Sequence, residues 1–380
     1  MRATPFAGAF VMSRAYDLII VGAGIVGAAC AAECAQAGLH VLVVDRGIIG
    51  GGTTGAGMGH LVVMDDSEAQ FALTAYSVAL WKQHQLPASV EYDPCGTLWL
   101  AADEQEQAEV HRKQKYYGDR GVKTELLDER SVHEAEPNLR AGMAGGLVVL
   151  EDSVLYPPAA ARYLIDQALA AGAEVRLGVS VTQFKPEGGV VLADGTKVPA
   201  QRVVNATGPW SPSLCPGLPV RKRKGHLLIT DRYPGFVNHQ IIELGYLKSA
   251  HTAGKDSVAF NIQPRKNGQM LIGSSRQFEE EDTCIEQHIL DQMLRRALEY
   301  LPTLGQLSSI RAWTGNRAAT PDKLPIIGPS IDNDHIWLAT GHEGLGITTS
   351  LGTAQILTDL LLGRPTKIPS APYAPSRFAQ

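Results

Sequence analysis

The sequence is poor in cysteine, and the cysteines that it has do not suggest cross-linking. Five cysteines are scattered over 380 residues, an odd number that favours reduced thiols in a cytoplasmic protein over a disulfide framework. Cys30 and Cys34 stand four residues apart in an expected helix, a spacing that could also suggest metal ligands, but no second cysteine or histidine pair lies near them in the sequence. We therefore expect small packed side chains at these positions and no metal site.

Long apolar runs and long basic runs are also missing. No apolar segment reaches the ~18 residues of a membrane-spanning helix, and a formal net charge of -5 gives no basic face for nucleic acid. The short cluster Arg221-Lys222-Arg223-Lys224 is expected to be a solvated turn, with a docking patch as the alternative. Residues 1–14 are expected to be a disordered leader and not a signal peptide, with Met12 as an alternative start. A cytoplasmic location is expected, with peripheral attachment at the inner face of the membrane left open.

What is present indicates a globular chain of about two domains. The hydrophobic content is 44% and the charged content 19%, as in folded globular proteins, and 380 residues exceed one ordinary core. Strand, helix and strand signals at 17–21, 25–37 and 41–44 predict a βαβ unit. Residues 103–136 are charge-rich and expected to be helical, and strand segments between 219 and 275 predict a sheet of another kind. A nucleotide-binding domain interleaved with a β-rich insertion is the organisation that this order predicts.

Residues 22–27 carry the motif of a dinucleotide-binding turn. Gly22-Ala23-Gly24-Ile25-Val26-Gly27 follows an expected strand and opens an expected helix. In such a motif the first glycine allows a tight turn, the second lets a pyrophosphate approach the backbone, and the third lets the helix pack on the strand. Asp45 ends the next strand, where an acid accepts hydrogen bonds from ribose hydroxyls. With strand, helix and acid in register, the segment predicts a bound dinucleotide.

The segment after Asp45 helps to choose between FAD and NAD. RGIIGGGTTGAGMGH is rich in glycine and carries Thr53 and Thr54. It could be a flexible surface loop, or a loop that passes close to an isoalloxazine ring and a pyrophosphate and donates hydrogen bonds from both threonines. A simple NAD dehydrogenase usually continues from the acid into a helix. The loop therefore favours FAD, and an NAD dehydrogenase is the alternative.

Two later strand ends can approach the same cofactor. VVNATGPW at 203–210 brings small residues to the end of a strand, and LATGHEGLG at 338–346 forms a strand, a glycine turn and the start of a helix. The N-terminus of such a helix can face the N1/C2=O edge of a reduced flavin and stabilise its negative charge. Each segment alone is also typical of an ordinary tight loop.

Together these segments resemble the D-amino-acid oxidase family of FAD-dependent oxidoreductases. The resemblance covers nearly the whole chain: GAGIVG with Asp45, the glycine-threonine loop, NATG, MLIGSS, and TPDKLPIIG leading to ATGHEGLGITTS. Two departures are visible. The acid is Asp45 where the family mostly has glutamate, which shortens its reach to the ribose. The loop has no histidine where dimethylglycine-type relatives attach their flavin, so the resemblance implies non-covalent FAD.

The resemblance implies an α/β fold, with a Rossmann-like FAD-binding domain of the GR2 type and an inserted α+β substrate domain on an antiparallel or mixed sheet. We place the FAD-binding domain at 15–88, 146–216 and 312–366, and the substrate domain at 89–145 and 217–311. The residues expected to contact FAD are Gly22, Gly24, Ile25, Val26, Gly27, Asp45, Arg46, Thr53, Thr54, Gly57, Met58, Val181, Ala206, Thr207, Gly208, Trp210, Gly341, His342, Gly344, Leu345, Gly346, Ile347 and Thr348.

The implied reaction oxidises a C–N bond by hydride transfer from the substrate α-carbon to flavin N5 and gives an imine. The substrate carboxylate needs a cation, and Arg317 stands where family members place the carboxylate-binding arginine, with a surface salt bridge as the alternative. Tyr246 is a second carboxylate or lid contact, or a core residue. His60, His342 and Glu343 are candidates for the pocket wall, although histidines near cofactors often only bond the backbone. No strong general base is required if the amine binds neutral.

The finer expectations also come from the resemblance. GTTGAGMGHLVVMDD and GHEGLGITTS are most similar to segments of bacterial dehydrogenases of D-proline and D-hydroxyproline, and of opine oxidase and cyanide synthase subunits. A D-amino or imino acid is therefore expected as substrate, cis-4-hydroxy-D-proline first and D-proline next, with a quinone, a dye or O2 as electron acceptor. The alternatives are a glycine- or sarcosine-type oxidase that uses O2, and a flavin subunit active only with partner subunits.

Overall fold

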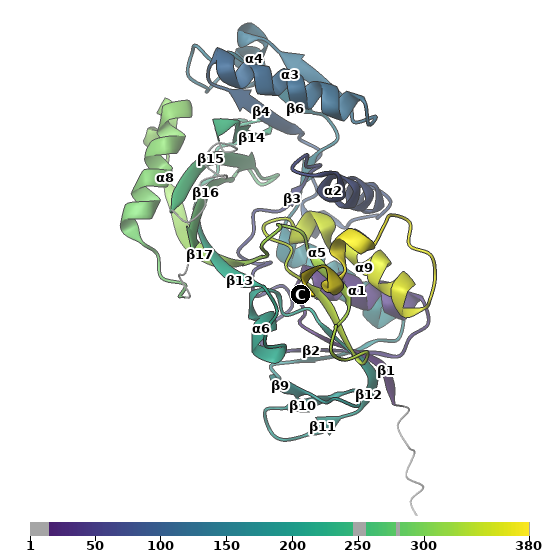
Figure 1. Cartoon of the computed structure of the whole chain (residues 1–380). Coiled ribbons are helices and arrows are strands. Elements are labelled where there is room, and N and C mark those ends of the chain that lie inside the picture. The colour runs from purple at the N-terminus through teal and green to yellow at the C-terminus, as the bar shows by residue number, and fades with distance from the viewer. Residues whose placement is uncertain (1–14, 246–255, 279–281, 380) are drawn as a thin grey trace, which may run out of the picture.

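The computed structural model describes residues 15–245, 256–278 and 282–379, and most of this chain is arranged around two large sheets (Figure 1). In the six-stranded sheet every neighbouring pair is parallel except β18–β19. Its strands, in spatial order, are β18 (Ile326–Pro329), β19 (Ile336–Thr340), β12 (Ala200–Asn205), β1 (Tyr16–Val21), β2 (Val41–Asp45) and β8 (Glu174–Leu177). This is the α/β fold that the alternating strand and helix signals predict.

The six-stranded sheet is covered on both faces. Leu18 and Ile20 of β1 pack toward helices α1 (Ile25–Gln36), α5 (Pro157–Ala170) and α9 (Gly346–Leu361). Ile19 and Val21 face the opposite side, because side chains alternate along a strand. That side is covered by a small sheet of β9 (Val181–Phe184), β10 (Val190–Leu192) and β11 (Lys197–Val198), the lowest element in Figure 1.

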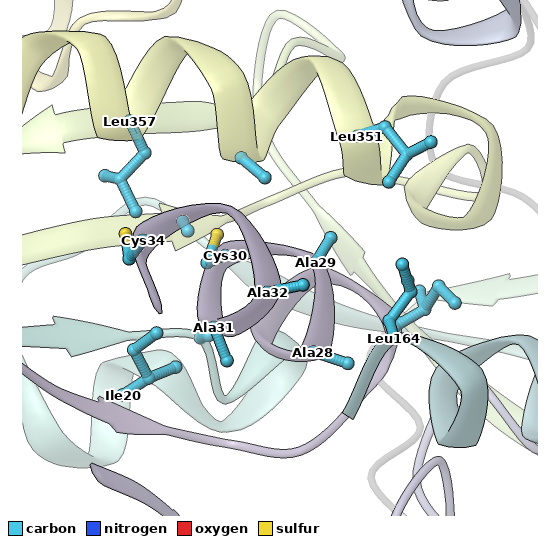
Figure 2. Close-up of a cluster of buried hydrophobic side chains, with 14 of the residues drawn as sticks. Ile20, Ala28, Ala29, Cys30, Ala31, Ala32, Cys34, Leu164, Leu351 and Leu357 are labelled. Atoms are coloured by element: carbon cyan, nitrogen blue, oxygen red, sulfur yellow. The ribbon is translucent and has the colours of Figure 1, made fainter. Parts of the chain in front are cut away.

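Helix α1 lies at the centre of the helical layer and is built from small residues. Figure 2 shows its alanines between Leu351 and Leu357 of α9 on one side and Leu164 of α5 on another. Cys30 and Cys34 belong to this packed surface, and Cys34 Sγ lies 3.2 Å from Thr358 Oγ1. Both cysteines are free and buried, so the expectation of packed small side chains is confirmed for this pair.

The eight-stranded sheet is mixed. Pairing is antiparallel throughout except between β14 and β4. Its spatial order is β17 (Ser309–Ala319), β13 (Arg221–Thr230), β16 (Met270–Phe278), β15 (Ser257–Pro264), β14 (Gln240–Glu243), β4 (Thr97–Ala101), β6 (Gly145–Val149) and β5 (Thr124–Leu127). One face packs on α8 (Gln287–Tyr300) and α4 (Glu129–Ala135). At the β4–β6 end, the other face packs on α3 (Glu104–Gly118).

The remaining elements are short or connect the two sheets. Helix α2 (Glu68–Trp81) packs on α9, and its N-cap Ser67 accepts a hydrogen bond from Gln70 N. The others are β3 (His60–Leu61), β7 (Ser153–Val154), α6 (Ser211–Leu214), and the 3-10 turns η1 (Ala88–Val90), η2 (Gly208–Trp210), η3 (Pro302–Gln306), η4 (Ala371–Tyr373) and η5 (Pro375–Phe378). None of the helices in the described residues is long and apolar enough to cross a membrane.

The charge-rich segment 103–136 differs from the expectation of continuous helix. It forms α3 and α4 with strand β5 between them. Gly121 has φ +75° in the connection after α3, and Leu126 of β5 then pairs with Leu147 of β6. The pairing partner lies about twenty residues further along the chain, so the helical composition of the segment does not reveal it.

The two large sheets draw on chain segments close to the predicted domain ranges. Strands β6 and β17, however, run past the predicted boundaries at 145/146 and 311/312 and remain hydrogen-bonded in the eight-stranded sheet. By strand pairing, these boundaries therefore fall several residues later. The division into two domains itself stays a prediction.

Helix α1 approaches the turn after β1 so closely that position 27 has no room for a side chain. A Cβ on Gly27 would overlap the carbonyl oxygen of Gly22 and would also lie 3.3 Å from Ala206 Cβ. Real Cβ atoms do not approach backbone this closely, so any larger residue must push the helix away from the strand.

We expect Gly27→Ala to lower the free energy of unfolding by about 1–3 kcal/mol, because the overlap displaces a packed helix. Denaturant unfolding followed by circular dichroism measures the effect. Gly118→Ala is the matched control: Gly118 ends α3, and a Cβ there meets nothing within 4 Å. Equal stability of the two variants would contradict the packing explanation.

Candidate active site

A cavity of about 750 Å³ lies between the two large sheets. Val21, Asp45 and Ala206, at or just after the carboxyl ends of β1, β2 and β12, line one side of it. The opposite side is a face of the eight-stranded sheet. Open α/β sheets bind ligands at the carboxyl ends of their strands, and the volume is that of a ligand cleft. The cavity is therefore the candidate active site.

The turn between β1 and α1 presents its backbone to this cavity. Gly22 has φ +113°, and a Cβ on it would lie 2.5 Å from Ala206 O. Gly24, Ile25 and Val26 line the cavity at the N-terminus of α1, where the first backbone N–H groups have no partner inside the helix. Ile25 N donates to Thr54 Oγ1 at 2.9 Å. The turn suits a phosphate group.

Asp45 is held at the cavity rim by its own neighbours. Ala23 N donates to Oδ2 and Gly47 N to Oδ1, each at 2.7 Å. Each carboxylate oxygen keeps further lone-pair capacity, so Asp45 can still accept a hydrogen bond from a ribose hydroxyl. The Arg46 guanidinium lies 4.4 Å from the ring centroid of Trp210, and both residues line the cavity.

The glycine-threonine loop connects this turn to the inserted sheet. Thr53 Oγ1 donates to Asn316 O at 2.7 Å, and Trp313 Nε1 donates to Ala56 O at 3.3 Å. Thr53 thus ties the loop to β17, and Thr54 accepts from α1, whereas the sequence suggested that both hydroxyls donate to the cofactor. Both threonines nevertheless line the cavity.

The start of α9 is the second helix N-terminus at the cavity. Gly344, Leu345, Gly346 and Ile347 line it, and a Cβ on Gly346 would lie 3.7 Å from Val26 Cγ2 at the start of α1. Two helix dipoles therefore point at neighbouring parts of one cavity and favour negative charge there. With the glycine turn and Asp45, these donors fit the phosphates, the ribose and the electron-rich edge of a flavin dinucleotide.

His342 lies beside that helix start but is turned into the fold. Its Nε2 lies 3.0 Å from Thr353 Oγ1, and burial lowers its pKa to about 3. His342 is therefore neutral near pH 7 and supports the first turns of α9. The next residue, Glu343, has φ +52°, and its Oε1 accepts from Thr320 N at 3.0 Å.

The opposite wall is formed by one face of the inserted sheet. Arg223 is the strand partner of Arg317, and Gly225 of Gly315. Along the sheet, Ile242 is the partner of both Trp99 and Asn261, so these three side chains share one face. The wall consists of Trp99, Arg223, Gly225, Leu227, Ile242, Asn261, Ser274, Arg276, Gly315 and Arg317.

Arg317 crosses this wall over a glycine. A Cβ on Gly225 would overlap its guanidinium, so only glycine leaves space for the side chain there. Arg317 Nη1 donates to Ser275 O at 3.0 Å. The facing Arg223 forms an ion pair with Glu343, both nearly buried. Glu343 thereby balances one of two arginine charges that stand directly opposite each other.

The cluster at 221–224 is not the solvated turn that the sequence suggested. It begins strand β13 and pairs with β17 from Arg221 onward. Lys224 is fully buried and forms ion pairs with Asp282 at 2.7 Å and Glu286 at 3.0 Å. The alternation along the strand turns Arg223 to the cavity and Lys224 to the other face, which a run of like charges does not reveal.

His60 lies near Arg317 at the end of the loop. Burial lowers the pKa of His60 to about 4, and the Arg317 guanidinium adds to the effect. Thr348 Oγ1 donates to His60 O at 2.8 Å. A neutral imidazole adds no positive charge beside Arg317 near pH 7.

Most residues named from the sequence meet at the cavity. Three do not line it: Gly27 packs beneath the first turn, Gly341 packs against Thr320, and Thr348 bonds His60 O. Tyr246 lies outside the described residues. Arg223, Trp99 and Asn261 were missed; alternation marks them as sharing strand faces, but only the pairing of distant strands shows which face meets the cavity.

The sequence of this chain is similar to those of known proteins over nearly its whole length. The model of the family described as DAO, FAD dependent oxidoreductase, matches residues 17–360. Glycine oxidase of Pseudomonas aeruginosa is 28% identical over 378 residues, covering 94% of this chain and 98% of the relative. The hydrogen cyanide synthase subunit HcnC of the same species is 25% identical over 419 residues, covering 97% of each chain.

A solved structure agrees with the fold. The L-proline dehydrogenase of P. horikoshii has a TM-score of 0.85 and 25% identity, and the match covers 96% of this chain and 98% of that one. The match therefore extends over nearly the whole length of both chains. The chain belongs to the DAO family of FAD-dependent oxidoreductases, and FAD is its cofactor.

Proposed function

We propose that this enzyme oxidises the C–N bond of an amino or imino acid, with FAD bound non-covalently. The observation that carries the proposal is Arg317, held on the wall that faces the two helix N-termini. A planar guanidinium offers two parallel donors to a carboxylate. Glycine oxidase and L-proline dehydrogenase are named for an amino acid and an imino acid, and each of these substrates has an amine next to a carboxylate.

The side chains of the wall account for binding and orientation. Arg317 binds the carboxylate and so fixes the α-carbon. Leu227 and Ile242 of the wall, with Met58 of the glycine-threonine loop, supply apolar surface that excludes water. FAD, when bound, accepts the hydride and its two electrons. Because His60 is neutral near pH 7, the positive charge near the substrate carboxylate comes from the arginines. An amine that binds uncharged requires no strong base from the wall.

Among such substrates we propose a cyclic D-imino acid, with cis-4-hydroxy-D-proline first. Trp99 Nε1 and Asn261 Oδ1 are buried and have no hydrogen-bond partner among the described residues. The two residues flank Ile242 on the cavity face. A hydroxyl group both donates and accepts, so one ring hydroxyl suits the acceptor Asn261 Oδ1 and the donor Trp99 Nε1. The D configuration rests on the resemblance of the loop and α9 segments.

One experiment tests the proposed function and separates its alternatives. The purified protein should be yellow, and anaerobic addition of cis-4-hydroxy-D-proline should bleach its flavin absorption. Bleaching by glycine or sarcosine alone would favour the glycine/sarcosine-type enzyme and contradict the proline assignment. Hydrogen peroxide formed in step with substrate loss indicates an oxidase, and dependence on a dye or quinone indicates a dehydrogenase.

A second candidate function is that of a flavin subunit in a larger assembly. The relative HcnC is named as a subunit, and the match covers nearly all of both chains. FAD retained without turnover on isolation, together with co-purifying chains, would favour this candidate.

We also propose a cytoplasmic location, which suits the five free cysteines.

We expect Arg317→Met to lower kcat/KM for the imino acid by about 100-fold or more, chiefly through KM, because the carboxylate loses its charge-assisted hydrogen bonds. Steady-state kinetics at fixed pH measures the effect. Arg311→Met is the matched control on the same strand, since Arg311 is exposed and lies over Trp313. Equal effects of the two substitutions would refute the carboxylate role.

We expect Trp99→Phe and Asn261→Leu each to reduce the preference for cis-4-hydroxy-D-proline over D-proline by about 10–100-fold, because each removes one partner of the buried hydroxyl. The measurement is the ratio of the two kcat/KM values. Trp337→Phe is the control, because Trp337 Nε1 bonds Asp334 O at 3.0 Å and Trp337 is not among the lining residues. An unchanged ratio in both wall variants would reject the hydroxyl site.

A further inference from the structure

The pairing of β13 with β16 in the inserted sheet has a register shift near the residue that holds Arg317. The β13–β16 ladder pairs Lys224 with Gln277 and Leu228 with Ile272. Three residues of β13 therefore face four residues of β16, so β16 carries an extra residue between these pairs. Such a bulge interrupts the regular ladder and leaves backbone groups without their usual strand partner. Ser275 lies in this interval.

Ser275, at this bulge, contacts the side chains of both Arg317 and His226. Its carbonyl oxygen accepts from Arg317 Nη1 at 3.0 Å. Its hydroxyl oxygen accepts from His226 N at 2.8 Å and lies 2.9 Å from His226 Nδ1. Both Ser275 and His226 are fully buried. The carbonyl that orients Arg317 therefore belongs to a residue whose position is fixed by His226.

The other ring nitrogen of His226 identifies the tautomer. Glu286 N donates to His226 Nε2 at 3.0 Å, so Nε2 is an acceptor and carries no proton. Nδ1 then carries the proton and donates to Ser275 Oγ. One neutral imidazole thus joins the N-cap residue of α8 to the bulge in β16. His226 itself is not among the residues that line the cavity.

We propose that His226 is a positioning residue for Arg317. Its Nδ1–H···Oγ bond holds Ser275 so that the Ser275 carbonyl orients the guanidinium toward the substrate carboxylate. The proposal rests on the carboxylate role of Arg317 given under the proposed function. It assigns the two ring nitrogens different tasks: Nδ1 serves the binding site through Ser275, and Nε2 serves the start of α8.

This division can be tested by two substitutions that each keep one of the bonds. The amide of asparagine lies near the place of Nδ1, so His226→Asn retains a partner for Ser275 and loses the acceptor for Glu286 N. The longer side chain of glutamine reaches the place of Nε2, so His226→Gln retains the acceptor and loses the donor to Ser275. Each variant loses one buried hydrogen bond, and a merely structural role predicts similar effects for both.

The readout is equilibrium binding to the FAD-loaded protein by titration calorimetry. The probes are tetrahydrofuran-2-carboxylate, in which a ring oxygen replaces the amine and prevents imine formation, and its uncharged carboxamide. We expect His226→Gln to weaken binding of the carboxylate about tenfold or more and of the carboxamide less than about threefold. His226→Asn should bind both probes within about threefold of the parent. The two variants should have similar thermal unfolding midpoints and FAD content.

Other results overturn the proposal in recognisable ways. Equal loss of carboxylate affinity in both variants, loss of both probes in His226→Gln, or no loss at all would each reject a positioning role. Failure of His226→Gln to fold would be seen in its unfolding midpoint. His226→Asn and Ser275→Ala then test the proposal, which requires that Ser275→Ala weaken binding of the carboxylate probe more than binding of the carboxamide. If Arg317→Met leaves carboxylate binding unchanged, the proposed role of Arg317 fails first, independently of His226.

Discussion

The close approach of helix α1 to the turn after β1 is the constraint on which the site depends. Gly27 meets the backbone of Gly22 directly, and the alanines of α1 let α9 and α5 pack against it at short range. As a result the N-termini of α1 and α9 meet beside one another. Two backbone ends, each favouring negative charge, then line the same cavity, and this suits the negative charge that a flavin dinucleotide carries.

Charge on the opposite wall has to be balanced by other means, because that wall is a sheet and has no large dipole. Arg223 and Arg317 stand opposite each other on neighbouring strands, an arrangement that is unfavourable without anions. Glu343 pairs with Arg223, and the Ser275 carbonyl accepts from Arg317. Glu343 does so from a left-handed backbone conformation, which costs about 1 kcal/mol or more for a residue other than glycine. The loop before α9 thus serves both sides of the cavity, since its backbone leads into the N-terminus of α9 and its carboxylate pairs with Arg223 of the sheet wall.

The parts of the structure that the sequence predicted are those set by short-range patterns. The strand-glycine-helix order around Gly22 and the acid Asp45 are local, and so is the strand, glycine turn and helix start at 338–346. The face of a strand is not local: the run at 221–224 gave no sign that Arg223 meets the cavity while Lys224 is buried behind it. The hydrogen-bond partners of Thr53 and His342 were also missed. The partner of Thr53, Asn316, lies 263 residues away, and the partner of His342, Thr353, lies 11 residues further along in α9. Arg317 was found through resemblance, and pairing alone explains why its side chain faces inward.

Register ties these observations together. A slip of β17 by one residue against β13 would turn Arg317 away from the cavity, because side chains alternate along a strand. The long pairing from Arg221 to Thr230 makes such a slip costly, and the bulge in β16 then releases one carbonyl at the position where Arg317 needs an acceptor. The side of the cavity with the glycine turn is thus specified by several short local segments, and the sheet wall by strand pairing over long distances. Wall residues such as Asn261 and Trp99 can therefore be exchanged while the glycine turn and the two helix starts remain the same.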